Sequence, residues 1–312
     1  MAPVRIDTHH HIVPPFYASW LQSRGIQAAG GRLLPEWSVD GALDLMDSAG
    51  IGSGIFSVST PGVHLGDDGE AREMARATNE FMAHVVRSQS PGRFGFFAVL
   101  PLPEVEAAVA EARYALDVLG ADGVMLLASI RGTYLGDPAW EPLMDELGRR
   151  GTVVFVHPSE LQGPEVPGIP PFAADFLLDT TRAAIRLAQS GVLERYPDMK
   201  IVLSHAGGFL PFAAERVARI CSPDGSNEAG IARLRRFWFD TALSSSPYAL
   251  PSLLAFADPG QITFGSDWPF APKERSLHFA ALLDSYPLTD AQRHAIHRGN
   301  AERLFPRLGR VK

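Results

Sequence analysis

Short apolar stretches rich in β-branched and aromatic residues alternate along the chain with longer stretches in which apolar residues follow helical spacing. The short stretches have the length and composition of buried strands. Eight of them occur, at residues 4–9, 51–59, 93–100, 122–128, 152–156, 200–204, 237–241 and 261–265. The helical stretches between them include residues 71–88, 104–119, 138–150, 173–190 and 211–220. The pattern therefore predicts strand–helix alternation along the whole chain.

This alternation predicts parallel strands joined by right-handed helical crossovers. Eight such units close naturally into a (β/α)8 TIM barrel, and 312 residues suit that fold. No Pro/Gly/Ser-rich linker divides the chain, so we expect a single domain over residues 1–312. A doubly wound open sheet is the structural alternative. It would usually carry a glycine-rich phosphate-binding turn after its first strand, where this sequence has histidines.

Composition favours a large core and excludes several partners. With 46% hydrophobic and 20% charged residues the chain shows no sign of disorder. The net charge of −7, without a cluster of Lys and Arg, argues against nucleic acid. No apolar run is long enough to cross a membrane, and the N-terminal residues lack the pattern of a signal peptide. Because the single cysteine, Cys221, also excludes an internal disulfide, we expect a cytoplasmic protein.

Residues that commonly bind metals stand at the ends of the predicted strands. In (β/α)8 barrels the active site is built at the C-terminal strand ends. Five of the eight expected ends carry such residues, which are His9, His10, His11, His157, His205, Asp240 and Asp267. Buried polar groups need partners and buried charges need neutralisation. A metal ion provides both, so the sequence predicts a metal site at this end of the barrel.

The first strand, with the sequence RIDTHHH, shows which histidines can share an ion. Successive strand residues point to opposite faces, so Asp7, His9 and His11 share one face and His10 takes the other. We expect Asp7 to orient a ligand imidazole from behind. The full expected set of ligands is His9, His11, His157 and Asp267. This set suits Zn²⁺ or a similar ion and leaves a position open for water or substrate.

Other polar residues have simpler interpretations. A lone strand histidine is more often a buried core residue than a ligand, so the prediction depends on the joint occurrence of the four. Asp240 has either a direct role or only a hydrogen bond to a neighbouring loop. The remaining histidines are expected at the surface or in packing, and they are His64, His84, His278, His294 and His297.

The motifs DxHxH, HP, SHAGG and GSDWPF, in this order, resemble the amidohydrolase superfamily, specifically its amidohydrolase-2 branch. This branch contains the aminocarboxymuconate-semialdehyde decarboxylases and the salicylate-type decarboxylases. The resemblance extends over most of the chain, through residues 135–158, 177–208, 239–250 and 299–305. These motifs are specific for the branch but less so for its chemistry, because one barrel can host several reactions.

The resemblance implies one divalent ion held by His9, His11, His157 and Asp267, Zn²⁺ being the first choice and Mn²⁺ the alternative. It implies that His205 is the catalytic histidine beside the open coordination position. No organic cofactor is required. The fourth predicted strand ends in GVMLLAS and offers no lysine to bridge two metals, which favours a mononuclear site. Family members are often dimers or larger, so a homodimer or higher homo-oligomer is expected.

Two reactions use the same ligands. A non-oxidative decarboxylase of an aromatic or unsaturated carboxylic acid, of hydroxybenzoate or muconate-semialdehyde type, would use Asp267 or His205 to manage the proton that replaces CO₂. A hydrolase of an ester, lactone, thioester or amide would use them to assist attack by water. A metal-binding scaffold without activity is the third possibility. We prefer the decarboxylase, with a small carboxylic acid as substrate.

Aromatic residues in the βα loops support this preference, because they could wall a flat apolar pocket. Arg131, close to the fourth strand, could anchor a carboxylate bidentately. The expected substrate-binding residues are Phe16, Tyr17, Arg131, Trp268 and Phe270. Further aromatic candidates in these loops are Trp20, Tyr134 and Phe172.

Overall fold

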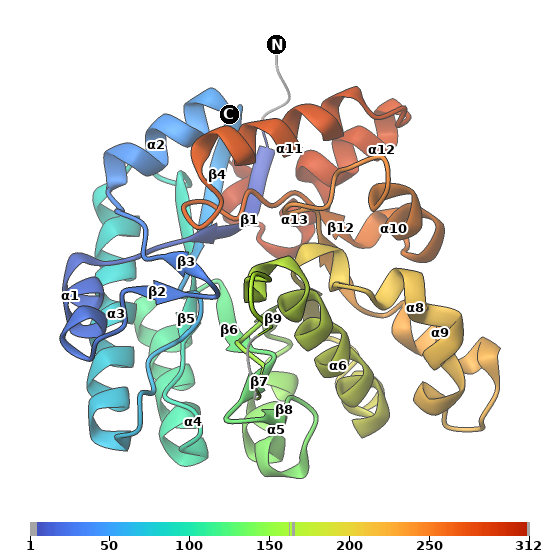
Figure 1. Cartoon of the computed structure of the whole chain (residues 1–312), viewed down its shortest axis with the longest axis horizontal. Helices are drawn as coiled ribbons and strands as arrows, with labels where there is room; N and C mark the ends of the chain where they lie inside the picture. Colours follow the sequence, from blue (N-terminus) through green and yellow to red (C-terminus); the bar gives the residue numbers. More distant parts are fainter. Residues whose placement is uncertain (1–4, 162, 164–165, 311–312) are drawn as a thin grey trace.

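The computed structural model describes residues 5–161, 163 and 166–310. A barrel of eight parallel strands occupies its centre (Figure 1). In chain order, which is also their order in the sheet, the strands are β1 (Arg5–His11), β4 (Ile51–Ser57), β5 (Phe94–Val99), β6 (Gly123–Leu127), β9 (Val153–His157), β10 (Lys200–Leu203), β11 (Trp238–Asp240) and β12 (Ile262–Thr263). All eight strands predicted from the sequence are therefore confirmed.

The first and last strands are joined by backbone hydrogen bonds. The amide of Thr8 donates to the carbonyl of Phe264 over 2.9 Å, and the amide of Asp267 donates to the carbonyl of His9 over 2.8 Å. Because these bonds connect the two edges of the sheet, the (β/α)8 barrel is confirmed and the open doubly wound sheet is excluded.

Helices surround the barrel, and the five predicted helical stretches are confirmed (Figure 1). They correspond to α3 (Asp68–Ser88), α4 (Val105–Tyr114), α5 (Glu141–Arg149), α6 (Asp175–Ser190) and α8 (Leu210–Val217). Further helices lie outside these five stretches, and they are α1 (Pro15–Ser23), α2 (Val39–Ser48), α7 (Val192–Arg195), α9 (Asn227–Leu234), α10 (Leu250–Phe256), α11 (Lys273–Ser285), α12 (Asp290–His294) and α13 (Asn300–Leu304). Two small hairpins, β2 (Ala28–Ala29) with β3 (Arg32–Leu33) and β7 (Ser129–Ile130) with β8 (Thr133–Tyr134), lie in βα loops.

Phenylalanines fill the barrel below the C-terminal strand ends. Phe97 and Phe155 are fully buried and stack with their ring centres 5.4 Å apart. Burying such a side chain contributes about 1.5–3 kcal/mol. The ring of Phe155 also lies 4.9 Å from the ring of His9. An apolar floor therefore closes the barrel beneath the polar strand ends. Within the described residues, no helix has both the length and the apolar character needed to cross a bilayer.

Candidate metal centre

Four buried side chains from distant parts of the chain converge at the C-terminal end of the barrel. They are His9 and His11 at the end of β1, His157 at the end of β9 and Asp267 after β12, and their candidate ligand atoms all lie within 4.8 Å of one another. The Nε2 atoms of His9 and His11 are 3.0 Å apart, and Oδ1 of Asp267 lies 3.0 and 3.1 Å from them. Ligands bonded at 2.0–2.2 Å to one ion at right angles are about 3 Å apart. The donor set and its spacing therefore fit one metal ion.

The second nitrogen of each candidate histidine ligand is held from behind. Nδ1 of His9 lies 2.7 Å from Oδ2 of Asp240, and Nδ1 of His157 lies 3.0 Å from the carbonyl oxygen of its neighbour Pro158. Nδ1 of His11 lies 3.0 Å from Oγ of Ser57. Such contacts fix the tautomer and the ring orientation of metal-binding histidines. They leave each Nε2 free to face the common centre.

The electrostatics of the site call for positive charge. Burial alone would lower the pKa of His9, but the carboxylates of Asp240 and Asp267 outweigh it and raise this pKa to about 10. Burial would likewise raise the pKa of Asp267, yet His9 and hydrogen bonds from His11 and His205 hold it well below its usual range. In the absence of an ion, a proton on His9 supplies the charge that the two carboxylates require.

His11 and His157 remain neutral in the same surroundings. Burial lowers the pKa of His11, and it lowers the pKa of His157 further with the help of the neighbouring histidines. A histidine binds a metal through the lone pair of its neutral ring. These two side chains are therefore in the protonation state that a ligand needs.

The expected role of Asp7 is wrong. Its Oδ2 lies 3.0 Å from Nδ1 of His10, and its Oδ1 accepts the backbone amides of His9 and Ser266. The reason is a bulge: Asp7 pairs with Gly54 and His10 with Phe56, so three steps along β1 match two along β4. The bulge breaks the alternation that placed Asp7 behind a ligand. Asp240 takes that position instead.

His10 points away from the centre, as the alternation predicts. Its ring lies 5.1 Å from Trp268 and 5.7 Å from Phe56. It is a packing residue on the helix-facing side of β1.

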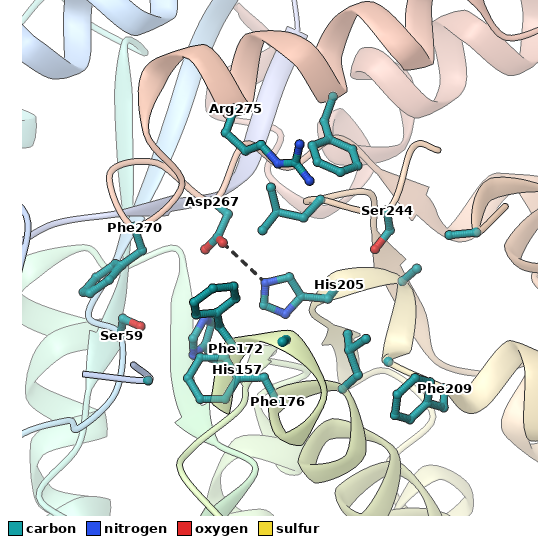
Figure 2. A pocket seen from close by; sticks show the side chains of 18 of the residues that line it. Ser59, His157, Phe172, Phe176, His205, Phe209, Ser244, Asp267, Phe270 and Arg275 are labelled. Atoms are coloured by element: carbon teal, nitrogen blue, oxygen red, sulfur yellow. Dashed lines mark ion pairs between the residues drawn. The ribbon is translucent and has the colours of Figure 1, made fainter. Parts of the chain in front are cut away.

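His205 lies beside the candidate ligands without being one of the four. Its Nε2 is 3.6 Å from Oδ2 of Asp267, and among the described residues its buried Nδ1 has no hydrogen-bond partner (Figure 2). The backbone amide of His205 donates to Oδ1 of Asp240 over 2.9 Å. Asp240 thus fixes both His9 and His205. The sequence left open whether Asp240 has a direct role or only bonds a neighbouring loop. In the structure it supports both a candidate ligand and the proposed catalytic histidine.

Unusual backbone conformations orient the side chains of His205 and Asp267. His205 and Asp267 have φ of 52° and 60°, in the left-handed region that residues with a Cβ rarely adopt. Such strain costs about 1–3 kcal/mol and persists where the surrounding structure enforces it. In the turn after β10, Gly208 has φ of 64°, and a Cβ there would lie 2.1 Å from the carbonyl oxygen of Leu177. The turn that presents His205 therefore requires glycine at this position.

A cavity of about 470 Å³ opens above the candidate centre (Figure 2). His157, His205 and Asp267 lie at its polar end. Much of the remaining wall is aromatic, with Phe172, Phe176, Phe209, Phe212, Tyr248, Phe270 and Phe279. Two arginines, Arg32 and Arg275, also line it. Its size and character suit a small aromatic ligand with a polar group at one end.

The expected substrate-binding residues are only partly brought together here. Phe270 lines the cavity, with its ring 5.5 Å from that of His11. Arg131 lines a neighbouring pocket of about 200 Å³. Among the described residues that line the main cavity, Phe16, Tyr17 and Trp268 do not occur.

The contacts of these three residues explain their position. The buried hydroxyl of Tyr17 donates to the carbonyl of Gly62 over 2.6 Å. The ring of Phe16 packs 5.7 Å from that of Phe81, and Trp268 packs on His10. Apolar loop residues near strand ends are used here for packing.

Several residues of the cavity were not predicted from the sequence, above all Phe176 and Arg275. Phe176 belongs to a helix that was predicted, but the apolar pattern does not show that its side chain points into the cavity. Arg275 belongs to α11, whose apolar residues run together at 279–283 instead of recurring at helical spacing. The residues that follow the GSDWPF motif read APKER, and nothing in this pattern separates Arg275 from Lys273.

Together, the closed barrel and the buried group of three histidines and one aspartate define a metal-dependent (β/α)8-barrel enzyme. The sequence model of the amidohydrolase family matches residues 6–307, and the chain belongs to this family. The resemblance inferred from the motifs is confirmed.

Similar proteins include several decarboxylases. The chain is 38% identical to the 6-methylsalicylic acid decarboxylase of Penicillium expansum over 315 residues, covering 97% of each chain. It is 38% identical to decarboxylase macB of Penicillium terrestre, covering 97% of this chain and 95% of the relative. Among solved structures, the dihydroxybenzoic acid decarboxylase of Polaromonas sp. JS666, with bound manganese and the inhibitor 2-nitroresorcinol, superposes with a TM-score of 0.80 at 25% identity. That match covers 99% of this chain and 98% of the other.

Proposed function

We propose that the protein is a metal-dependent, non-oxidative decarboxylase of an aromatic carboxylic acid of the hydroxybenzoate type. The observation that carries this proposal is the convergence of His9, His11, His157 and Asp267 at the base of an aromatic-walled cavity. The relatives support it, because they are named as decarboxylases of 6-methylsalicylic and dihydroxybenzoic acids. Because these relatives are named as decarboxylases, the hydrolase is not favoured.

The metal would be held by the four converging side chains. When bound, a divalent ion supplies Lewis-acid stabilisation for the negative charge that develops on the substrate oxygens. We propose Zn²⁺, with Mn²⁺ as the alternative, because both accept nitrogen and oxygen ligands. The manganese in the Polaromonas protein supports the alternative.

The reaction needs one proton and no oxidant. The bond between the carboxyl carbon and the ring breaks, its electron pair stays with the ring carbon, and a proton takes the place of CO₂. Nε2 of His205 lies 3.6 Å from Oδ2 of Asp267 at the cavity base, and this pair of side chains would deliver the proton to the ring carbon. The other ring nitrogen of His205, Nδ1, is buried and has no hydrogen-bond partner among the described residues.

The aromatic wall orients the substrate. Phe172, Phe176 and Phe270 present ring surfaces to the cavity beside the polar end. They would hold a flat ring and exclude water, which strengthens the electrostatic interactions at the reacting carbon.

We also propose that the chain forms a homodimer or a larger homo-oligomer. Phe212 and Tyr248 line the mouth of the cavity with 88% and 91% of their surface exposed. Large exposed apolar side chains that lie together favour association. Light scattering at several protein concentrations tests this, and a monomer at every concentration would contradict it.

The activity is tested with the metal-reconstituted protein and a panel that contains salicylate, 6-methylsalicylate and 2,6-dihydroxybenzoate. We expect release of CO₂ and of the corresponding phenol from at least one acid, and none from the His157→Ala variant. Ester and lactone hydrolysis are assayed in parallel. Hydrolysis without decarboxylation at any metal loading would overturn the proposal.

A further inference from the structure

Two arginines line the cavity, and within the described residues neither is paired with a carboxylate. The guanidinium carbon of Arg275 lies 4.8 Å from the ring centre of Phe279, and that of Arg32 lies 4.2 Å from Phe172. Other arginines on the surface do form ion pairs. Arg24 and Arg72, for example, are each hydrogen-bonded to a glutamate. The charges in the cavity are therefore left available.

Arg275 is the arginine that overhangs the reacting end. It lies in the first turn of α11, eight residues after Asp267, and its side chain extends over the cavity above Asp267 and His205, with Ser244 on the other side (Figure 2). A cation in the first turn of a helix lies at the positive end of the helix dipole. The charge of Arg275 therefore does not stabilise α11. The presence of an arginine at this position must have another cause.

Within the part of the chain that the structure describes, no carboxylate pairs with Arg275. Among the described residues that line it, Asp267 is the single carboxylate, and its Oδ1 already faces His9 and His11 at 3.0 and 3.1 Å. The chain as a whole carries a formal charge of −7, which repels an anionic ligand. A guanidinium inside the cavity reverses this repulsion locally.

We propose that Arg275 recognises the carboxylate of the substrate at the reacting end of the cavity, above Asp267 and His205, and so makes the site prefer the acid over the neutral phenol that remains after CO₂ leaves. This inference rests on the proposed decarboxylase function. A guanidinium binds a carboxylate through two parallel hydrogen bonds. Stacking on Phe279 holds the planar group in place, which reduces the entropy lost on binding. Product release then follows from the loss of the charge that Arg275 recognises.

The test compares Arg275→Ala with Arg275→Lys in the metal-loaded protein. Hydrogen bonds to charged groups support a rise in KM of about tenfold for Arg275→Ala, with kcat within twofold. The inhibition constant of the phenol product should stay unchanged, because the phenol has no carboxylate. Arg275→Lys should recover part of the affinity for the acid, since lysine keeps the charge but cannot make the two parallel hydrogen bonds of a guanidinium.

Salt provides an independent readout that a merely structural role would not change. Raising the ionic strength screens exposed charges. The KM of the wild type should therefore rise with salt more steeply than that of Arg275→Ala. Arg216→Ala is the matched control, because it removes an equal charge from an exposed position on α8. It should keep the wild-type KM and salt dependence.

The outcomes separate the inference from the function on which it rests. If no aromatic acid is decarboxylated by any of the proteins, the proposed function is wrong. If the wild type decarboxylates the acid and Arg275→Ala keeps its KM and salt dependence, only the role of Arg275 is wrong. Equal weakening of acid and phenol binding would also overturn it, since that is the result of a damaged cavity wall. So would a loss of acid affinity confined to Arg131→Ala, which would restore the expectation from the sequence.

Discussion

His205 and Asp267 face each other at the base of the cavity, and their proposed roles differ in a measurable way. His205→Asn should keep the metal, because His205 is outside the group of four, and should lower kcat by about 10²–10⁴-fold, the usual contribution of a general acid or base. Asp267→Ala should lose both metal and turnover. Elemental analysis of the purified variants, together with kcat, checks this. A His205→Asn protein purified without metal would make His205 a ligand.

Asp240 provides a second test at the same scale. It holds Nδ1 of His9 and the backbone amide of His205, so Asp240→Asn should weaken metal binding by about 10–100-fold, as the loss of such supporting contacts generally does. Competition with a chelator of known affinity measures this. Asp224→Asn is the control, because Asp224 is an exposed residue bonded within its own turn. Equal affinity in the Asp240 and Asp224 variants would contradict the supporting role.

The four candidate ligands could be read from the sequence because each stands at a predicted strand end, where the fold determines what is close to what. Asp7 could not be placed, because a bulge depends on backbone pairing between two strands and leaves no sign in the sequence RIDTHHH. Asp240 was found, but its hydrogen bonds to Nδ1 of His9 and to the amide of His205 join β11 to β1 and to the turn after β10. Those bonds are long-range contacts, and local patterns do not report them.

At the scale of elements, strands were predicted more reliably than helices. The eight strands are short, apolar and bounded by polar residues. The helices after β11 and β12 were not predicted from the sequence, because α10 has only seven residues and the apolar residues of α11 are contiguous. Arg275 was therefore missed although its neighbour Asp267 was found. Its contribution to the cavity exists only once α11 is folded against the barrel.

The turn after β10 offers an element-scale prediction. Gly208→Ala should destabilise the protein by about 1–3 kcal/mol and lower activity, because the new methyl group would displace Leu177 or move the turn that presents His205. Gly225→Ala is the matched control: Gly225 has φ of 75°, but a Cβ there meets nothing within 4 Å. It should cost only about 1 kcal/mol and leave activity intact. Chemical denaturation and steady-state rates check both, and equal effects of the two variants would contradict the argument.

The packing of the C-terminal segment against the barrel predicts a pH dependence. His297 is 1% exposed next to Phe264, and burial, with repulsion from Arg5, lowers its pKa from 6.5 to about 4. The unfolded chain therefore binds the proton at a higher pH than the folded chain does. The resulting stabilisation is fully present above pH 6.5 and is lost as the pH falls towards 4.

His297→Phe should remove this dependence. Between pH 7 and pH 5 the wild type should lose about 2 kcal/mol more stability than the variant. Urea unfolding at both pH values, with chelator present so that metal loss does not contribute, measures the difference. Identical losses in the two proteins would show that His297 does not titrate in this way.

For the whole molecule, the metal would act as a cross-link between the first, middle and last parts of the barrel. The candidate ligands come from β1, β9 and the loop after β12, which are far apart in the chain. Binding to the folded state alone stabilises it by about 2.7 kcal/mol when the free ion is at one hundred times Kd. Removing the ion also leaves Asp240 and Asp267 to be neutralised by a proton on His9.

A chelator should therefore lower Tm of the wild type, and added Zn²⁺ or Mn²⁺ should restore it. By the usual relation between stability and Tm in large domains, a shift of about 5–10 °C is expected. His157→Ala is the control, because it lacks one candidate ligand and should respond weakly to both additions. Thermal unfolding followed by circular dichroism measures the shift. If neither chelator nor metal changes the Tm of the wild type, no ion cross-links the barrel. The convergence of the four side chains would then need another explanation.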